Sequence, residues 1–539
     1  MTATPERKPV ERIGVIFVHG IGEQGAFEHL ESGAVEMILA LRAKESGKRI
    51  TAAINTTADA TYKAGQQTWR AENCAPVWID VTDGDTRTFQ RIELREVWWA
   101  DLDEQARFMS MLRFLWWGCT LWARPTYLVA NLKSFEEKLF TPRARYAQVP
   151  DRATASRPAG KPDAPALPSK RDRAQLFFSA ALFLLVLPTW SLAGLVLRSL
   201  RLPTLPSAKI LIDYFGDVKL YGQQHRHDTW PLSDLGTPPR FMIRRRFAQA
   251  LIDTVTAGYD RWYLLGHSLG SVVALNGLME PGHTLPNYLD EGRWRKCRET
   301  GLSRTLPDIL VTDVANMIPA RPAWLSDGDA IDRRKLFERF RGLLTYGSPL
   351  DKFAVLFPAT VPLNRDQAVF PDRAEWINVH EPTDPVAGAL DSFGPFTDPT
   401  TPDAGLRAIA PVNYSVRCWP VLMWSHLKHF NSPGANPFAD AVQKWLIGGG
   451  SFADAFKRAG ATDFSGRDAL RRWSKLPQVG VFFLATLVLF TWLVLWLRPK
   501  VWAGWTSFRS WVAGLLDWYD WLGSLVQALG APLRWVAAL

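Results

Sequence analysis

The chain has 539 residues, more than one hydrophobic core normally serves, so we expect several structural units. Hydrophobic residues make up 47% and charged residues 22%, and the 38 Gly and 37 Pro are near average usage, which excludes a disordered, collagen-like or low-complexity chain. The net charge of +10 suggests nucleic acid, but no nucleic-acid-binding motif is present and the basic residues cluster beside apolar segments, which favours an anionic membrane surface.

Cysteine and tryptophan usage narrows the class of protein further. The four cysteines, Cys74, Cys119, Cys297 and Cys418, are too scattered for a disulfide framework or a zinc site, which indicates a reducing compartment. Of the 25 tryptophans, eight lie in the last 51 residues. Tryptophan concentrates at membrane–water interfaces, so the composition favours a membrane-associated protein.

The first predicted element is a strand over residues 13–18, a short apolar β-branched run typical of a strand buried in a parallel sheet. The residues before it, MTATPERKPVERIG, lack the apolar stretch of a signal peptide. In the loop HGIGEQG that follows, Gly20, Gly22 and Gly25 match the dinucleotide-binding fingerprint, but no acidic residue ends a second strand about twenty positions on. The alternative is the His-Gly turn of hydrolases, in which a backbone N–H helps to bind an oxyanion.

Three apolar segments predict contact with a membrane. Residues 176–197 and 479–497 carry no charge, and each is long enough to cross about 30 Å of hydrocarbon as a helix. Pro188 interrupts the first of them, so it is either a spanning or a re-entrant segment. The aromatic stretch 114–122 is too short to cross, and we expect it to lie in the interface.

These segments divide the chain into seven parts, and the bias of Lys and Arg around them places the N-terminal bulk of the chain, with the domain that carries the glycine loops, on the cytoplasmic side. The expected parts are 1–140, the first part of the catalytic domain with an interfacial aromatic stretch near 108–132; 141–174, a basic Pro-rich linker; 175–200, the first membrane segment; 201–450, the second part of the domain with a lid at 281–341; 451–476, a basic juxtamembrane segment; 477–497, a transmembrane helix; and 498–539, Trp-rich interfacial helices.

A second glycine loop lies in residues 261–279, RWYLLGHSLGSVVALNGLM, where an apolar strand leads into G-H-S-L-G and then into a helix pattern rich in small residues. The turn is so tight that Gly266 and Gly270 have no room for side chains, and its strain presents the Ser268 hydroxyl at the end of the sheet. The backbone N–H of Leu269, at the start of the helix, points to the place where an oxyanion would form.

With these two loops, residues 12–446 resemble the α/β-hydrolase superfamily, specifically its lipase and esterase branch. The resemblance implies an α/β fold with a doubly wound, mostly parallel sheet, to which this chain adds inserted and C-terminal membrane-associated helices. It also implies a catalytic triad in the chain order nucleophile, acid, histidine, with Ser268 as the nucleophile. The segment RGLLTYGSPLDK (341–352) is similar to the strand that follows the elbow in lipases.

The resemblance selects the other two members of the triad. In EWINVHEPTDPVAG (375–388) an apolar strand ends in an Asp-Pro-Val turn, which implies Asp384 as the acid, with Asp372 and Asp391 as alternatives. The segment MWSHLKHF (423–430) implies His426 as the base and puts His429 at the aromatic position of the family pattern.

Other polar residues near these motifs receive lesser roles. The N–H groups of Ile21 and Leu269 are expected to form the oxyanion hole, with His19 bracing the loop. His380 is expected to be a strand-end residue. The H-x-x-H spacing of the two late histidines lacks the helical H-E-x-x-H pattern and a third ligand, so we expect no metal and no cofactor.

The sequence therefore predicts a membrane-bound serine hydrolase, a carboxylic ester hydrolase that cleaves a lipid-like ester. Alternatives are a catalytically inactive hydrolase-fold scaffold that binds partners in the membrane and, from the first loop, a nucleotide-dependent oxidoreductase. If residues 176–197 crossed the bilayer alone, the two glycine loops would lie on opposite sides, so we favour a re-entrant segment over a hairpin with 107–132. The identity of the lipid or ester and the oligomeric state stay open.

Overall fold

The structure is a computed structural model, and the residues that it describes fall into a main block and scattered positions. The described ranges are 11–20, 33–37, 48–54, 77–83, 89–99, 239–306, 321–357, 370–381, 386–391, 409–416 and 436–461, with isolated positions that include Asp384, His426 and His429. The chain divides into two compact units, Met1–Lys475 and Leu476–Leu539. In the second unit, the described positions between 506 and 524 are helical and exposed.

The first unit is built on an eight-stranded mixed sheet in the order β10-β9-β8-β5-β1-β4-β3-β2. The strand β3 runs antiparallel to both of its neighbours, β2 and β4, and the pairings from β4 through β1 to β10 are all parallel. The strands are β1 (Glu11–Val18), β2 (Lys48–Ile54), β3 (Val77–Asp83), β4 (Phe89–Val97), β5 (Arg261–His267), β8 (Phe340–Tyr346), β9 (Glu375–His380) and β10 (Val412–Ser415). A separate hairpin pairs β6 (Ser303–Thr305) with β7 (Asp329–Ile331).

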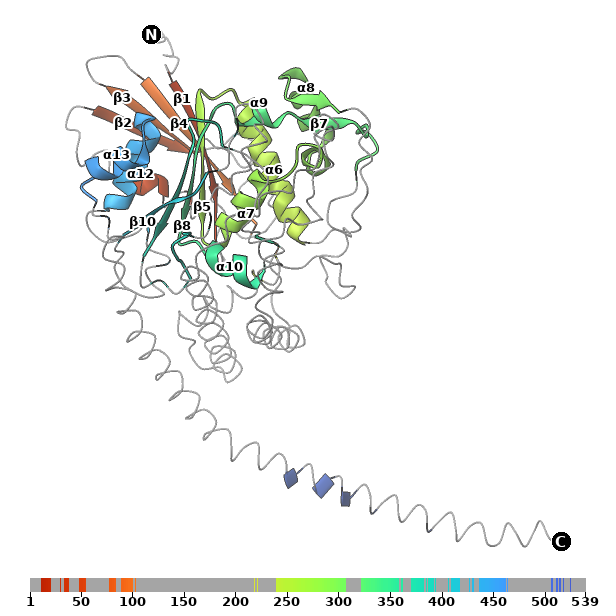
Figure 1. Cartoon of the computed structure of the whole chain (residues 1–539). Coiled ribbons are helices and arrows are strands. Elements are labelled where there is room, and N and C mark those ends of the chain that lie inside the picture. The colour runs from red at the N-terminus through yellow and green to blue at the C-terminus, as the bar shows by residue number, and fades with distance from the viewer. Residues whose placement is uncertain are drawn as a thin grey trace, which may run out of the picture. The chain divides into compact units, whose positions relative to one another are not determined.

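Helices lie on both faces of the sheet, with α6 and α7 on one face and α12 and α13 on the other (Figure 1). The described helices are α6 (Pro239–Thr256), α7 (Leu269–Leu278), the 3-10 helix η4 (Leu285–Tyr288), α8 (Glu291–Glu299), α9 (Arg333–Phe337), α10 (Leu350–Leu356), α12 (Pro437–Gly448) and α13 (Phe452–Arg458). Each face of the sheet has its own hydrophobic core, one with α6 and α7 and one with α12 and α13. Side chains of β1 alternate between them: Ile16 and Val18 join the first core, and Val15 and Phe17 join the second. The predicted α/β fold with a mostly parallel sheet is confirmed.

This topology brings the two glycine loops together. The strands β1 and β5 are parallel neighbours, so the loops that leave their carboxyl ends start at the same edge of the sheet. After β1 the chain forms β2, β3 and β4, which all lie on one side of β1, and it then forms β5 on the other side of β1. The carboxyl ends of β1 and β5 are therefore a topological switch point. Open α/β sheets bind their ligands at such points.

The range 281–341, expected to form a lid, does not cover this edge in its described part. Its elements η4, α8, β6, β7 and α9 pack on α6 and on the amino-terminal ends of β5 and β8. Phe337 of α9, for example, lies against Trp262, the second residue of β5, with the ring centroids 6.3 Å apart. The described part of this range therefore covers the core at the end of the sheet opposite Ser268.

The prediction of a transmembrane chain needs a correction. Where the structure describes the chain, none of its helices combines the length and the apolar character that a bilayer crossing requires. The physical reason is clear in the longest described helix, α6, which has 18 residues but carries four arginines. The segments 176–197 and 479–497, the linker 141–174 and the aromatic stretch 108–132 lie outside the described residues.

Candidate active site

Ser268 lies at the sharp turn between β5 and α7. Its φ of 49° and ψ of −128° make it the one non-glycine residue with a positive φ in the described part of the chain. Such a backbone costs about 1 to 3 kcal/mol, so close packing must hold it in place. A Cβ on Gly266 would lie 2.8 Å from the Cα of Ser271. A Cβ on Gly270 would lie 2.3 Å from the carbonyl oxygen of His19, so both glycines are required by close approach, as the sequence predicts.

The structure brings Ser268, His426 and Asp384 together in one hydrogen-bonded row. The Nε2 atom of His426 lies 2.9 Å from the Oγ atom of Ser268, and its Nδ1 atom lies 2.8 Å from the Oδ2 atom of Asp384. These atoms come from positions 158 and 42 residues apart in the sequence, and all three side chains are buried. Because the carboxylate accepts at Nδ1–H, the Nε2 lone pair faces the serine hydroxyl, which is the tautomer that a general base requires.

The carboxylate of Asp384 is fixed from its own loop. The Val386 N–H donates to Oδ1 at 2.8 Å, which leaves Oδ2 for His426, and the Asp384 N–H donates to the Glu381 carboxylate at 3.1 Å. Burial on its own would raise the pKa of Asp384, but the adjacent His426 and the hydrogen bonds from His426 and Val386 outweigh it, and the pKa lies below its ordinary value. The acid is therefore ionised at neutral pH, as an orienting carboxylate must be.

Two further histidines hold the backbone of His426. Its carbonyl oxygen lies 2.9 Å from Nε2 of His267 and 3.2 Å from Nδ1 of His429. A carbonyl oxygen can only accept, so both ring nitrogens carry hydrogen. Burial lowers the pKa of His429 to about 4, which keeps its imidazole neutral near pH 7. The sequence motifs do not predict this arrangement, although His267 stands inside the G-H-S-L-G motif.

The predicted oxyanion hole lies only partly within the described residues. Leu269 is the first residue of α7, so its N–H has no acceptor within the helix and is available beside Ser268. Ile21 lies outside the described residues. Its predecessor Gly20 passes directly beside the nucleophile, because a Cβ on Gly20 would lie 2.6 Å from the Cβ of Ser268. The loop after β1 thus reaches the nucleophile, where the predicted second N–H donor would be needed.

His19 joins the ends of two neighbouring strands beneath that loop. Its Nε2 atom accepts a hydrogen bond from the Trp99 N–H at 2.9 Å, and its ring stacks on the Trp99 indole with centroids 4.9 Å apart and 17° between the planes. His19 and Trp99 follow the parallel strands β1 and β4 and are both fully buried. This contact fits the bracing role expected for His19.

The alternative acids lie elsewhere. Asp391 accepts a hydrogen bond from the Asn413 side chain at 2.9 Å. Asp372 is exposed before the first residue of β9, at the opposite end of the sheet from Ser268. His380 is the last residue of β9, where its carbonyl oxygen accepts from the Val416 N–H at 3.0 Å, so it is the strand-end residue that we expected. Of the candidates, Asp384 alone is bonded to His426 among the described residues.

A serine pair behind the nucleophile was also missed. The Ser271 hydroxyl donates to the Ser268 carbonyl oxygen at 2.6 Å and lies 2.6 Å from the Ser348 Oγ. Because a hydroxyl has one hydrogen, Ser348 must donate to Ser271. Ser348 belongs to the Gly-Ser-Pro turn after β8, so this pair ties that turn to the nucleophile elbow.

The two late histidines do not form a metal pair. Both ring nitrogens of His426 are engaged, one by Ser268 and one by Asp384. In the described residues no group of three or more His, Cys, Asp or Glu side chains is placed to hold a metal ion.

Comparison with family models, with curated proteins and with solved structures finds no match to this chain. Any assignment of function therefore depends on the motifs and on the geometry described above.

Proposed function

We propose that the protein is a serine hydrolase of the α/β-hydrolase type that cleaves a carboxylic ester through an acyl-enzyme. The observation that carries this proposal is the row Ser268–His426–Asp384, with hydrogen-bond distances of 2.9 and 2.8 Å, at a strained strand-to-helix turn. The chain order serine, acid, histidine is the one used on α/β-hydrolase sheets. The predicted dinucleotide alternative gains no comparable support, since Gly20 faces Ser268 and the other two glycines lie outside the described residues.

In the proposed mechanism Ser268 Oγ attacks the acyl carbon while its proton passes to Nε2 of His426. The carboxylate of Asp384 stabilises the imidazolium that forms, and the Leu269 N–H stabilises the oxyanion. His426 then gives the proton to the departing alkoxide, which leaves as an alcohol. In the second half, His426 takes a proton from water, the resulting hydroxide attacks the acyl carbon, and Ser268 leaves with that proton. We propose a lipid-like ester as the substrate, on the resemblance to lipases and esterases.

The rival function is a hydrolase-shaped scaffold without activity. It does not require a serine in a strained backbone, which costs about 1 to 3 kcal/mol. It does not require a buried imidazole bonded to both a hydroxyl and a carboxylate either.

A covalent probe separates the two functions. A fluorophosphonate should label the wild-type protein at Ser268, and Ser268→Ala should abolish the labelling. Ser303→Ala, which changes a serine on the distant β6, serves as the matched control and should label like the wild type. A parallel assay with a short-chain p-nitrophenyl ester should give turnover that follows the labelling. A folded wild-type protein that neither reacts with the probe nor hydrolyses the ester would establish the scaffold.

A further inference from the structure

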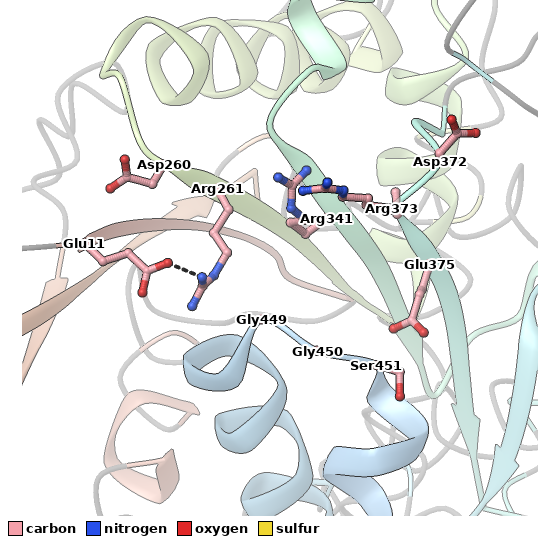
Figure 2. A pocket seen from close by; sticks show the side chains of 11 residues that line it. Glu11, Asp260, Arg261, Arg341, Asp372, Arg373, Glu375, Gly449, Gly450 and Ser451 are labelled. Carbon is pink, nitrogen blue, oxygen red and sulfur yellow. Dashed lines mark hydrogen bonds and ion pairs between the residues drawn. The ribbon is translucent and has the colours of Figure 1, made fainter.

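A pocket lies at the opposite end of the sheet from Ser268. Its volume is about 600 Å³, and it opens at the amino-terminal ends of β1, β5, β8 and β9 (Figure 2). The residues that line it are Glu11, Asp260, Arg261, Arg341, Asp372, Arg373, Ala374, Glu375, Gly449, Gly450 and Ser451. Pockets of 300 to 1,000 Å³ are the usual size for small-molecule ligands, so the volume suits a metabolite.

A β-bulge directs Arg341 into this pocket. The register between β5 and β8 shifts where Trp262 pairs with Phe340, while the next residue, Tyr263, pairs with Gly342. Arg341 is therefore the extra residue of β8, with no partner on β5. Bulges re-aim side chains, and they are enriched next to binding and active sites. The residue at this bulge, Arg341, is half-buried in the wall of the pocket.

Arg341 faces a second arginine. In Figure 2 the Arg373 side chain extends toward the guanidinium group of Arg341, and both residues line the pocket. Burial lowers the pKa of Arg341, and so do the positive charges of Arg373 and Arg261. The one hydrogen bond recorded for the Arg341 side chain among the described residues goes to the carbonyl oxygen of Phe340, at 3.3 Å. Like charges held this close repel, and an anion between them would relieve the repulsion.

The carboxylates of the pocket serve other partners. Glu11 accepts hydrogen bonds from Arg261 and Gln90, and Asp260 accepts one from the Arg12 N–H. Glu375 accepts hydrogen bonds from the Trp445 indole and the Phe452 N–H. Asp372 is exposed at the rim of the pocket. Arg261 is itself used, since it also donates to the carbonyl oxygens of Leu446 and Ile447 at the end of α12. Within the described residues, Arg341 and Arg373 are therefore the arginines of the pocket that form no ion pair with one of its carboxylates.

We propose that this pocket binds the phosphate group of a small phosphorylated molecule between Arg341 and Arg373. Guanidinium groups match phosphate geometry with paired N–H donors, and two of them neutralise a dianion. The opposite wall leaves space for the rest of the ligand, because a Cβ on Gly450 would meet nothing within 4 Å. The site is separate from the proposed active site, so its existence does not depend on hydrolase activity.

Titration calorimetry with inorganic pyrophosphate, against sodium chloride of equal ionic strength, tests the proposal. Pyrophosphate should bind the wild-type protein and raise its melting temperature. Arg341→Ala and Arg373→Ala should each weaken binding about tenfold or more, and Arg341→Lys should restore part of it. Arg304→Ala, which removes an exposed arginine of β6, is the matched control and should bind like the wild type, as should Ser268→Ala.

A second arm separates a soluble phosphate compound from a lipid headgroup. Vesicles of phosphatidylcholine and phosphatidic acid are tested by co-sedimentation with the same variants. Retention on vesicles that depends on Arg341 and Arg373, without binding of pyrophosphate, would replace the soluble ligand by a lipid phosphate and overturn the proposal. Pyrophosphate that fails to bind folded wild-type protein at millimolar concentration, or that binds the two alanine variants equally well, would overturn it too.

Discussion

The Nε2 atom of His267 lies 2.9 Å from the backbone carbonyl oxygen of His426, so the residue before the proposed nucleophile holds the backbone of the proposed base. The two residues are 159 positions apart, and this hydrogen bond joins the turn at Ser268 to the backbone at His426. Gly347, the residue after β8, lies close to both rings, because a Cβ there would lie 3.2 Å from the His426 ring and 3.3 Å from the His267 ring. The distance from His426 to Ser268 thus depends on His267, whose ring also packs against the His426 ring with the centroids 5.1 Å apart.

We expect His267→Phe to lower kcat while KM changes little. Phenylalanine keeps a ring against Tyr346, which His267 stacks on at 5.0 Å, but it lacks the N–H donor. A misplacement of the base by about 1 Å costs up to a hundredfold in rate, so the expected loss is between about tenfold and a hundredfold. His267→Gln, whose amide can donate to the same carbonyl oxygen, should recover part of the loss. Equal kcat values and pH profiles for wild type and His267→Phe would show that the bond does not position His426.

Asp384→Asn should lower kcat by about four decades while the fold survives, because an amide favours the wrong tautomer of His426. The measurement is steady-state hydrolysis of a short-chain ester, with circular dichroism to verify folding. Asp391→Asn is the matched control: its carboxylate contacts Asn413 and not the imidazole, so activity should be close to wild type. Near-full activity of Asp384→Asn would assign the orienting role to another group.

The sequence was informative wherever local chemistry determines the structure. Short apolar runs predicted β1 and β5, because strands buried on both faces are apolar throughout. The spacing of Gly266 and Gly270 predicted a turn that the structure shows to be sterically closed to side chains. Family resemblance then selected Asp384 and His426, and the structure brings both to Ser268.

The sequence was uninformative where distant segments meet. Nothing in the motifs indicates that His267 and His429 both donate to one carbonyl oxygen, because that contact depends on where β5 lies relative to His426. The β-bulge at Arg341 is likewise a property of strand pairing, and the run RGLLTY shows no sign of it. Loop length predicted a lid at 281–341; in the described part of this range, most apolar side chains are buried in the core.

Replacing Ser268 should reveal the cost of its backbone conformation. Ser268→Gly and Ser268→Ala both remove the hydroxyl and should both be inactive, but glycine adopts a positive φ without strain. We expect Ser268→Gly to have a free energy of unfolding about 1 kcal/mol above that of Ser268→Ala, after the greater chain entropy of glycine is included. Urea unfolding of the two variants measures the difference. A more stable alanine variant would show that the turn is not strained in solution.

The approach of the β1 loop to the nucleophile can be tested with one methyl group. Gly20→Ala places a Cβ 2.6 Å from that of Ser268, closer than Cβ atoms pack, so the loop or the elbow must move. Because both carry proposed oxyanion donors, we expect kcat to fall about a hundredfold or more, as it does when one such donor is lost. Gly450→Ala adds a methyl group that meets nothing within 4 Å and should leave kcat unchanged. An active Gly20→Ala variant would place the oxyanion site elsewhere.

The buried His429 makes the stability of the protein depend on pH. Its pKa lies at about 4 in the folded state, chiefly through burial, against an ordinary value of 6.5. Between these two values the unfolded chain binds a proton that the folded protein rejects. The contribution of neutral His429 to the free energy of unfolding is fully present above pH 6.5. The free energy of unfolding should therefore fall by about 3 kcal/mol as the pH drops from 6.5 to 4.

His429→Phe should remove this dependence. The new ring would take the place of the imidazole beside Tyr346 and Phe438, whose centroids lie 5.6 and 5.9 Å from it, and it has no proton to bind. The free energy of unfolding is measured by urea titration at several pH values in this window. The curve of His429→Phe should be flatter than that of the wild type above pH 4, while carboxylates with lowered pKa values, such as Asp384, act at lower pH in both proteins. Parallel curves for the two proteins would show that His429 titrates near its ordinary pKa, and that its ring is reached by water in solution.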